Sequence, residues 1–254
     1  FRKKFTIYSL DKKKPQKKIK INKKNFFHCD LLNKKKLNKI FKKIKPNLII
    51  HLAAKSTVNE KINKENYKFN NINATKNLLD VMRENCIDKI IFSSTAAVYD
   101  KSENKIEENY RLNPISTYGK TKLAAERIIY KKKDLNFVIL RFFNVSGSIK
   151  NPTIGEFHNP ETHLIPTVVY KSLKNKKINI FGNNYNTIDG TCVRDYVHIK
   201  DICRAILLSA NYLFKKINRK IFLNIGNGYG ISNLQVVNKL NNYCLNNSLD
   251  ISNL

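Results

Sequence analysis

The sequence predicts an α/β protein with a doubly wound, parallel, Rossmann-like sheet and a second, smaller mixed domain. Short apolar runs alternate with longer amphipathic stretches through the first half of the 254-residue chain. The short runs are nearly continuous in β-branched and aromatic residues, which is typical of strands buried on both faces of a parallel sheet. Polar residues follow several of these runs, at the sheet edge where such folds bind ligands.

The expected elements follow from these patterns in chain order. Strands are predicted at residues 5–10, 26–29, 48–52, 90–92, 137–142 and 222–225. Helices are predicted at residues 73–82, 120–130, 167–173 and 201–213, the last with Asp201 as a candidate N-cap. Residues 148–166 carry three prolines and no clear periodicity, which predicts a long loop.

These elements suggest two domains. The first covers residues 1–147 and contains the parallel sheet. The second covers residues 148–254, and segments at about 194–213 and 222–226 are expected to return to the first sheet. No run approaches the roughly 20 apolar residues of a membrane span, and the amino-terminal residues do not resemble a signal peptide.

The formal charge of +29 raises the question of nucleic-acid binding. The excess is mostly lysine, scattered through every segment beside abundant asparagine and isoleucine, which resembles a compositional bias acting on solvated positions. Arginine, the usual base-reading residue, is scarce. We therefore expect no specific nucleic-acid partner, only salt-sensitive adhesion to polyanions.

The cysteines are odd in number and widely spaced. They are Cys29, Cys86, Cys192, Cys203 and Cys244, and they contain no C-x-x-C pair. This pattern is unlike a zinc or redox motif and predicts buried, reduced thiols in a cytoplasmic protein without a metal.

Tyr118 and Lys122 stand one helical turn apart, on the same face of the predicted helix. A nearby ammonium favours phenolate over phenol and so lowers the pKa of a tyrosine. Such a tyrosine can take a proton from an alcohol near neutral pH, which is the proton half of a hydride transfer. Because lysine is abundant here, the spacing also fits a helix start with a solvated lysine.

Polar residues after the strands could form a nucleotide site. Asp11 ends the first strand, where a carboxylate can accept from both ribose hydroxyls; taken alone it could instead form a turn. Asp30 ends the next strand and could bind an adenine amino group or cap a helix. The small residues Ala53 and Ala54 allow a ligand to approach the backbone, or allow tight helix packing.

Three further strand ends carry groups suited to a phosphorylated or hydroxylated ligand. The hydroxyls of residues 93–95 are not needed for packing, and one of them could bridge a substrate alcohol and Tyr118. Asn144 could bind a phosphate oxygen or a sugar hydroxyl. Arg194 could clamp a diphosphate, or pair with Asp195 at the surface.

Together these residues resemble the extended short-chain dehydrogenase/reductases of the NAD-dependent epimerase/dehydratase family, especially the members that invert C4 of a UDP-hexose. The resemblance rests on residues 51–54, 93–99, 118–122, 140–144, 160–166 and 181–198, of which the last is the most characteristic. It implies interconversion of UDP-glucose and UDP-galactose through a 4-keto intermediate, with NAD as the cofactor.

The resemblance also implies a role for each matching residue. Tyr118, Lys122 and Thr95 would be catalytic. The NAD site would comprise Asp11, Asp30, Leu31, Ala53, Ala54, Asn71, Ser93, Lys122 and Phe142. The UDP-sugar would contact Thr95, Asn144, His163, Leu164, Asn179, Phe181 and Arg194. His163 stands where many family members have asparagine.

The sequence departs from the family at both ends. It lacks the glycine-rich loop that holds the cofactor pyrophosphate and the family's Arg-x-Gly-Asp region, so we expect both domains to be incomplete and the chain to be a fragment. A homodimer through the helices after Asn71 and around Tyr118 is an expectation from the family.

Three other functions stay open to different degrees. A 4,6-dehydratase needs an Asp-Glu pair after Thr95, where this chain has Ala96 and Ala97. An epimerase for UDP-N-acetylglucosamine or UDP-glucuronate fits the same motifs. A non-catalytic remnant with a polyanion-binding surface would fit the charge.

Overall fold

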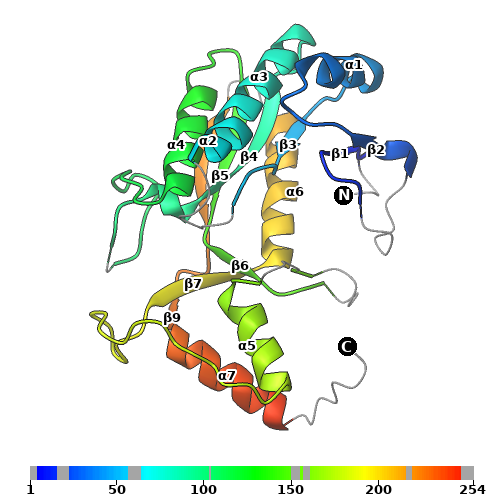
Figure 1. The fold of residues 1–254 in the computed structure, drawn as a ribbon. Helices are drawn as coiled ribbons and strands as arrows, with labels where there is room; N and C mark the ends of the chain where they lie inside the picture. The colour runs from blue at the N-terminus through cyan, green and yellow to red at the C-terminus, as the bar shows by residue number, and fades with distance from the viewer. Residues whose placement is uncertain are drawn as a thin grey trace. The chain divides into compact units, whose positions relative to one another are not determined.

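The computed structural model describes residues 5–15, 23–56, 64–102, 104–149, 155–156, 161–215 and 219–246. The chain forms two compact units (Figure 1). The first unit comprises residues 1–142 and 203–225, and the second comprises residues 143–202 and 226–254. The division falls at residue 142, at the end of a strand, rather than at residue 147.

The first unit contains a four-stranded parallel sheet. Its strands are β3 (Ile49–His51), β4 (Lys89–Thr95), β5 (Asn136–Phe142) and β8 (Lys220–Ile225), paired in the order β3-β4-β5-β8. In this register Thr95 lies opposite Phe142, so two predicted site residues end neighbouring strands. The parallel sheet predicted from the apolar runs is confirmed.

A second parallel pair lies in the same unit. It consists of β1 (Ser9–Asp11) and β2 (Phe26–His28), with Asp11 opposite His28. Its hydrogen bonds do not join it to the four-stranded sheet in the described part of the chain. The predicted strand at 5–10 was placed too early, because its first residues are not paired.

Helices cover the sheet. They are α1 (Lys34–Ile44), α2 (Lys64–Tyr67), α3 (Ala74–Glu84), α4 (Thr117–Tyr130) and α6 (Ile199–Lys215), with short turns η1 (Lys23–Asn25), η2 (Lys68–Asn73, a π-helix) and η3 (Ala96–Val98). Apolar residues of α1, α3 and α4 form one core cluster with alternate residues of β4 and β5. The intervening residues Ile91, Val138 and Leu140 are equally buried, so both faces of the sheet are covered, as in a doubly wound fold.

The second unit holds a small mixed sheet and two helices. β6 (Asn144–Ser146) pairs in parallel with β7 (Val193–His198), which pairs antiparallel with β9 (Gly230–Ser232). α5 (Leu164–Leu173) and α7 (Asn233–Asn246) pack side by side (Figure 1). β7 therefore belongs to this sheet, and the expectation that residues from 194 return to the parallel sheet was wrong up to residue 202.

Several helix starts also differ from the prediction, and α4 begins at Thr117 rather than at residue 120. α5 begins at Leu164, with Pro166 inside its first turn, where a missing N–H costs no helical hydrogen bond. α6 begins at Ile199, so Asp201 lies in the first turn and is not the N-cap. A first-turn carboxylate still interacts favourably with the helix dipole.

The cysteines and the membrane prediction can be compared with the structure. Cys29 is buried, whereas Cys86 is exposed and Cys192 and Cys203 are partly exposed, so burial was predicted correctly only for Cys29. All four are free thiols, and Cys244 lies among residues whose side chains are not described. Among the described residues, every helix is too short or too polar to cross a membrane.

Candidate active site

The first turn of α4 fixes the position of Tyr118. Ser116 is the N-cap, and its hydroxyl accepts a hydrogen bond from the Gly119 backbone N–H at 3.0 Å. A Cβ atom on Gly119 would lie 2.3 Å from the Ala97 carbonyl oxygen, so this close approach requires glycine. The turn therefore lies against η3, and Tyr118 lies beside Thr95.

Tyr118 and Thr95 share a side-chain hydrogen bond. Thr95 Oγ1 also accepts from the Ala97 backbone N–H at 3.2 Å, which fixes the threonine rotamer. Burial raises the pKa of Tyr118, and the bond to Thr95 lowers it by less. The pKa of Tyr118 is therefore above its ordinary value in this structure, where we had expected Lys122 to lower it.

Lys122 turns into the protein interior. Its side chain is buried, and Nζ lies 4.1 Å from the centre of the Phe92 ring. Burial lowers the pKa of Lys122 to about 7, although the Glu126 carboxylate raises it. The ammonium is thus only partly populated near neutral pH, and its effect on Tyr118 is correspondingly weak here.

The carboxyl ends of β1 and β2 carry the two predicted adenosine-binding aspartates. Asp11 Oδ1 accepts from the Lys13 backbone N–H at 2.7 Å, and Asp30 Oδ1 accepts from the Leu32 N–H at 2.9 Å. Both carboxylates thus stabilise turns. The N-cap of α1 is Asn33, so Asp30 is not the helix cap that the sequence left open.

Two of the predicted NAD-site side chains are engaged within the protein. The Asn71 amide accepts from the Lys55 N–H at 2.7 Å and donates to the Lys55 carbonyl at 3.1 Å and to Thr121 Oγ1 at 3.0 Å. Ser93 Oγ donates to the His51 carbonyl at 3.1 Å. Both residues therefore shape the carboxyl end of β3, where Ala53 is exposed and Ala54 partly exposed.

The remaining two NAD-site residues are partly buried. Leu31 packs against the core cluster, and its carbonyl accepts from the Asn77 side chain at 3.1 Å. Phe142 ends β5 beside Thr95. Their apolar surfaces are suited to the flat rings of a dinucleotide.

The residues present fit part of an NAD site. Carboxylates at two adjacent strand ends suit an adenosine, and a hydroxyl, a phenol and a buried lysine converge near the end of β4. The sequence contains eight glycines, and the first of them is Gly119. A glycine-rich pyrophosphate loop is therefore not among these residues.

The second unit brings four of the predicted UDP-sugar residues together. Asn144, His163, Leu164 and Arg194 line one cavity of about 240 Å³. Arg194 does not pair with Asp195, whose carboxylate instead accepts from the backbone N–H groups of Asn227 and Gly228 at 2.8 and 2.7 Å.

Two predicted UDP-sugar residues lie outside that cavity. Asn179 and Phe181 follow α5 and are both exposed. Phe181 is 85% exposed, which is unusual for a phenylalanine and leaves its side chain accessible to a planar ligand.

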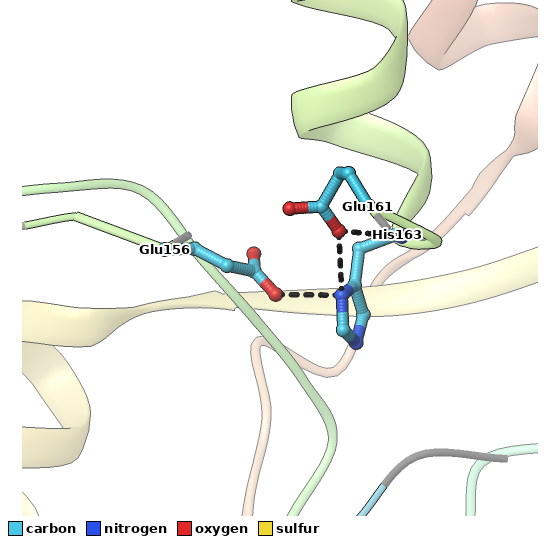
Figure 2. Close-up of side chains that lie close together, drawn as sticks. All are labelled: Glu156, Glu161 and His163. Carbon is cyan, nitrogen blue, oxygen red and sulfur yellow. Dashed lines mark hydrogen bonds and ion pairs between the residues drawn. The ribbon is translucent and has the colours of Figure 1, made fainter. Parts of the chain in front are cut away.

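His163 is held by two carboxylates (Figure 2). Its Nδ1 lies 2.8 Å from Glu156 Oε1 and 3.0 Å from Glu161 Oε1, and Nε2 faces away from both. Burial raises the pKa of Glu161, but hydrogen bonds from His163 and Thr162 outweigh it and lower that pKa. Neither Glu156 nor Glu161 was predicted as a site residue, although Glu161 lies in the motif at residues 160–166, because their contacts with His163 depend on the fold of the chain before α5.

The sequence interpretation also missed Glu126. Its carboxylate accepts hydrogen bonds from Ser94 Oγ, from Arg141 Nε at 3.1 Å and from Arg141 Nη2 at 2.8 Å, and all three side chains are buried. A signal was present, since Glu126 follows Lys122 by four residues on the apolar face of α4.

Comparison with known proteins identifies the family of the chain. The family model for the NAD dependent epimerase/dehydratase family matches residues 2–226. The chain belongs to the NAD-dependent epimerase/dehydratase family. Its similarity to individual members of the epimerase/dehydratase family extends over most of the chain.

Two relatives and one solved structure illustrate that similarity. UDP-glucose 4-epimerase of Halalkalibacterium halodurans is 38% identical over 218 residues, which are 84% of this chain and 65% of the relative. UDP-glucose 4-epimerase of Streptococcus mutans is 41% identical over 220 residues, which are 84% of this chain and 66% of the relative. The crystal structure of UDP-glucose 4-epimerase from Brucella ovis in complex with NAD superposes with a TM-score of 0.79 at 36% identity, over 84% of this chain and 67% of that one.

The chain thus spans about two thirds of the length of these epimerase/dehydratase relatives. The fold expected from the sequence is confirmed by this similarity, and so is membership of the family.

Proposed function

We propose that the complete protein interconverts UDP-glucose and UDP-galactose by reversible oxidation at C4 of the hexose. The observation that carries the proposal is the Tyr118–Thr95 hydrogen bond at the end of β4, one helical turn from the buried Lys122. The relatives in two bacteria that bear the name UDP-glucose 4-epimerase support the choice of substrate.

Tyr118 is the base in this proposal. As phenolate it takes the proton from the C4 hydroxyl, directly or through Thr95, and returns it when the carbonyl is reduced from the other face. Bound NAD supplies the hydride acceptor and donor. Burial raises the pKa of Tyr118, so the phenolate needs a positive charge nearby, which the Lys122 ammonium provides in this proposal.

The remaining roles divide between the two units. Asp11, Asp30 and Leu31 hold the adenosine, Lys122 the nicotinamide ribose, and Phe142 the nicotinamide, while Asn71 and Ser93 position Ala53 and Ala54. Asn144, His163, Leu164, Asn179, Phe181 and Arg194 hold the UDP group. A firm grip on UDP with few contacts to the hexose leaves the 4-keto sugar able to rotate between its two faces.

Other UDP-sugar substrates and a dehydratase reaction are weaker alternatives to this proposal. UDP-N-acetylglucosamine and UDP-glucuronate share the UDP group and fit the same residues. A 4,6-dehydratase is disfavoured because Ala96 and Ala97 cannot move protons. Within the same proposal the protein is cytoplasmic and forms a homodimer through α3 and α4.

The test uses the complete open reading frame. The purified protein is denatured and the released nucleotide identified, and then conversion of UDP-galactose is measured. We expect roughly one NAD per chain and measurable conversion. Protein without nucleotide or conversion would instead support a non-catalytic remnant.

Tyr118→Phe tests the role of the base. We expect kcat to fall by roughly 100-fold or more, because a general base contributes on the order of 10²–10⁴, while NAD is still bound. Tyr130→Phe is the matched control, since Tyr130 is an exposed tyrosine at the other end of α4. Turnover near the wild-type value in Tyr118→Phe would sink the assignment.

A further inference from the structure

A buried carboxylate joins the three elements that carry the proposed reaction centre. Glu126 lies on α4, the helix of Tyr118 and Lys122. Ser94, one residue before Thr95, donates to it from β4, and Arg141, one residue before Phe142, donates to it from β5. Glu126 therefore connects α4 to β4 and to β5, close to the ends of both strands.

Both oxygens of the Glu126 carboxylate accept hydrogen bonds. Arg141 binds both of its oxygens, and the Arg141 Nη1 group donates to Tyr99 Oη at 2.8 Å and to the Glu108 carbonyl at 3.0 Å. Burial lowers the pKa of Arg141, and the bonds to Glu126 more than offset this, so its pKa is raised overall. A bidentate pair of this kind fixes direction as well as charge.

Glu126 also acts on Lys122. The two residues stand four apart on α4, on the same buried face. Of the titratable groups described around Lys122, His51 on β3 is neutral near pH 7, because burial lowers its pKa to about 3. Tyr118 is neutral as well, since burial raises its pKa, and Arg141 acts through its pair with Glu126. Glu126 is thus the carboxylate that favours the Lys122 ammonium in its buried position.

We propose that Glu126 is a positioning residue for the reaction. It holds the helix of Tyr118 against the strand ends of Thr95 and Phe142, and it favours the ammonium form of Lys122 four residues away on the same buried face. The proposal rests on the function proposed above. Removing the charge leaves an ammonium in an apolar environment without a compensating carboxylate, which favours the neutral amine.

The test compares Glu126→Gln with Glu84→Gln and Glu126→Asp in the complete open reading frame. Glutamine keeps the shape and hydrogen-bonding capacity of Glu126 and removes its charge. Glu84 is a surface carboxylate that binds Lys34 in the same unit, so Glu84→Gln is a control for charge loss. Glu126→Asp keeps the charge.

Two measurements distinguish positioning from a merely structural role. The Lys122 side chain is titrated by its ¹³Cε chemical shift, assigned from its loss in Lys122→Met, and kcat for UDP-galactose is measured against pH. In Glu126→Gln we expect Lys122 to titrate about one pH unit lower and kcat near pH 8 to fall roughly tenfold, while KM stays within about twofold. Glu84→Gln should keep both wild-type values, and Glu126→Asp should keep the Lys122 titration.

Other results of the same experiments would contradict the role of Glu126. A Lys122 titration in Glu126→Gln equal to that of the wild type, or a kcat lowered by the same factor at every pH, would overturn the proposal. If Glu126→Gln does not fold, Ser94→Ala removes only the bond to β4, and an unchanged kcat in that variant would overturn the positioning role. The Lys122 titration uses no sugar nucleotide. If the protein binds NAD but converts no UDP-sugar, the proposed function is refuted, and the titration still tests the effect of Glu126 on Lys122.

Discussion

Tyr118 and Lys122, in the proposed reaction centre, have pKa values that differ from those of the free side chains. Tyr118 and Lys122 were identified from a spacing that predicts an ammonium beside a phenol. In the structure both side chains are largely removed from water, and burial raises the pKa of Tyr118 and lowers that of Lys122 to about 7. Burial disfavours the charged form of each group, which opposes the function expected of the pair. The spacing alone therefore does not favour the phenolate of Tyr118 or the ammonium of Lys122. In the function proposed here, bound NAD and the Glu126 carboxylate favour these charged forms.

The effect of burial on a pKa can be tested at His51. Burial and the neighbouring Lys122 lower its pKa from 6.5 to about 3, and its Nε2 bonds Thr75 Oγ1 at 2.9 Å. The unfolded imidazole takes up a proton as the pH falls below its ordinary value, whereas the folded one stays neutral down to about 3. Stability is therefore present above the ordinary pKa and is lost as the pH falls toward 3. We expect a loss of about 2 kcal/mol between about pH 7 and pH 5 from this residue.

The measurement is urea denaturation of His51→Gln and of the wild type at those two pH values. The variant should lose less of its free energy of unfolding between them, by about 2 kcal/mol. His28→Gln, which changes an exposed histidine, is the control for the substitution itself. An equal pH dependence in His51→Gln would contradict the assignment of a neutral, buried ring.

At the level of elements, the first turn of α4 decides where the base lies. Ser116 and Gly119 act together, the first by capping the helix and the second by permitting contact with the Ala97 carbonyl. The sequence interpretation placed the helix start at residue 120 and did not identify the cap, although serine is a preferred N-cap residue. The contact between Gly119 and the Ala97 carbonyl could not be predicted, because it depends on how the chain turns after β4.

Gly119→Ala should push this turn away from η3. The added Cβ would lie 2.3 Å from a backbone oxygen, which has to move. We expect a loss of about 1–3 kcal/mol in the free energy of unfolding, as for other overpacked sites, and a fall in kcat larger than the change in KM, because Tyr118 moves away from Thr95.

Thermal denaturation and steady-state kinetics check this prediction. Lys120→Ala is the matched control, since Lys120 is an exposed residue in the same turn. A Gly119→Ala protein with wild-type kcat would show that the close approach does not position the base.

The elements differ in how well their sequences predicted them. β4 and β5 are seven-residue strands buried almost throughout, and their apolar runs were found at nearly the right places. β6, β7 and β9 were missed, since all three are largely exposed or only partly buried and carry no continuous apolar pattern. Their pairing in the second unit depends on contacts between distant segments.

For the whole molecule, the charge of +29 is the most unusual property. It predicts adhesion to polyanions that is electrostatic and non-specific. Affinity for double-stranded DNA should fall by on the order of 100-fold or more between about 50 and 200 mM salt, since bound counterions are released on association. Fluorescence anisotropy with labelled duplexes of different sequences measures this directly.

Two features of that experiment make it decisive. Duplexes of unrelated sequence should bind alike, and UDP-galactose at saturating concentration should not displace them. Tight, sequence-selective binding at the higher salt concentration would favour nucleic acid as a biological partner over the sugar nucleotide.

The sequence by itself determined the parallel sheet, the family and the pairing of Tyr118 with Lys122 on one helical face, because these follow from local periodicity and short motifs. Only the tertiary structure decided the surroundings of that pair. Glu126 meets Ser94 and Arg141 from 32 and 15 residues away, and Lys122 is buried over Phe92. The physical reason is that burial and long-range contacts set the charge of an ionisable group, and neither is encoded in the spacing of its neighbours along the chain.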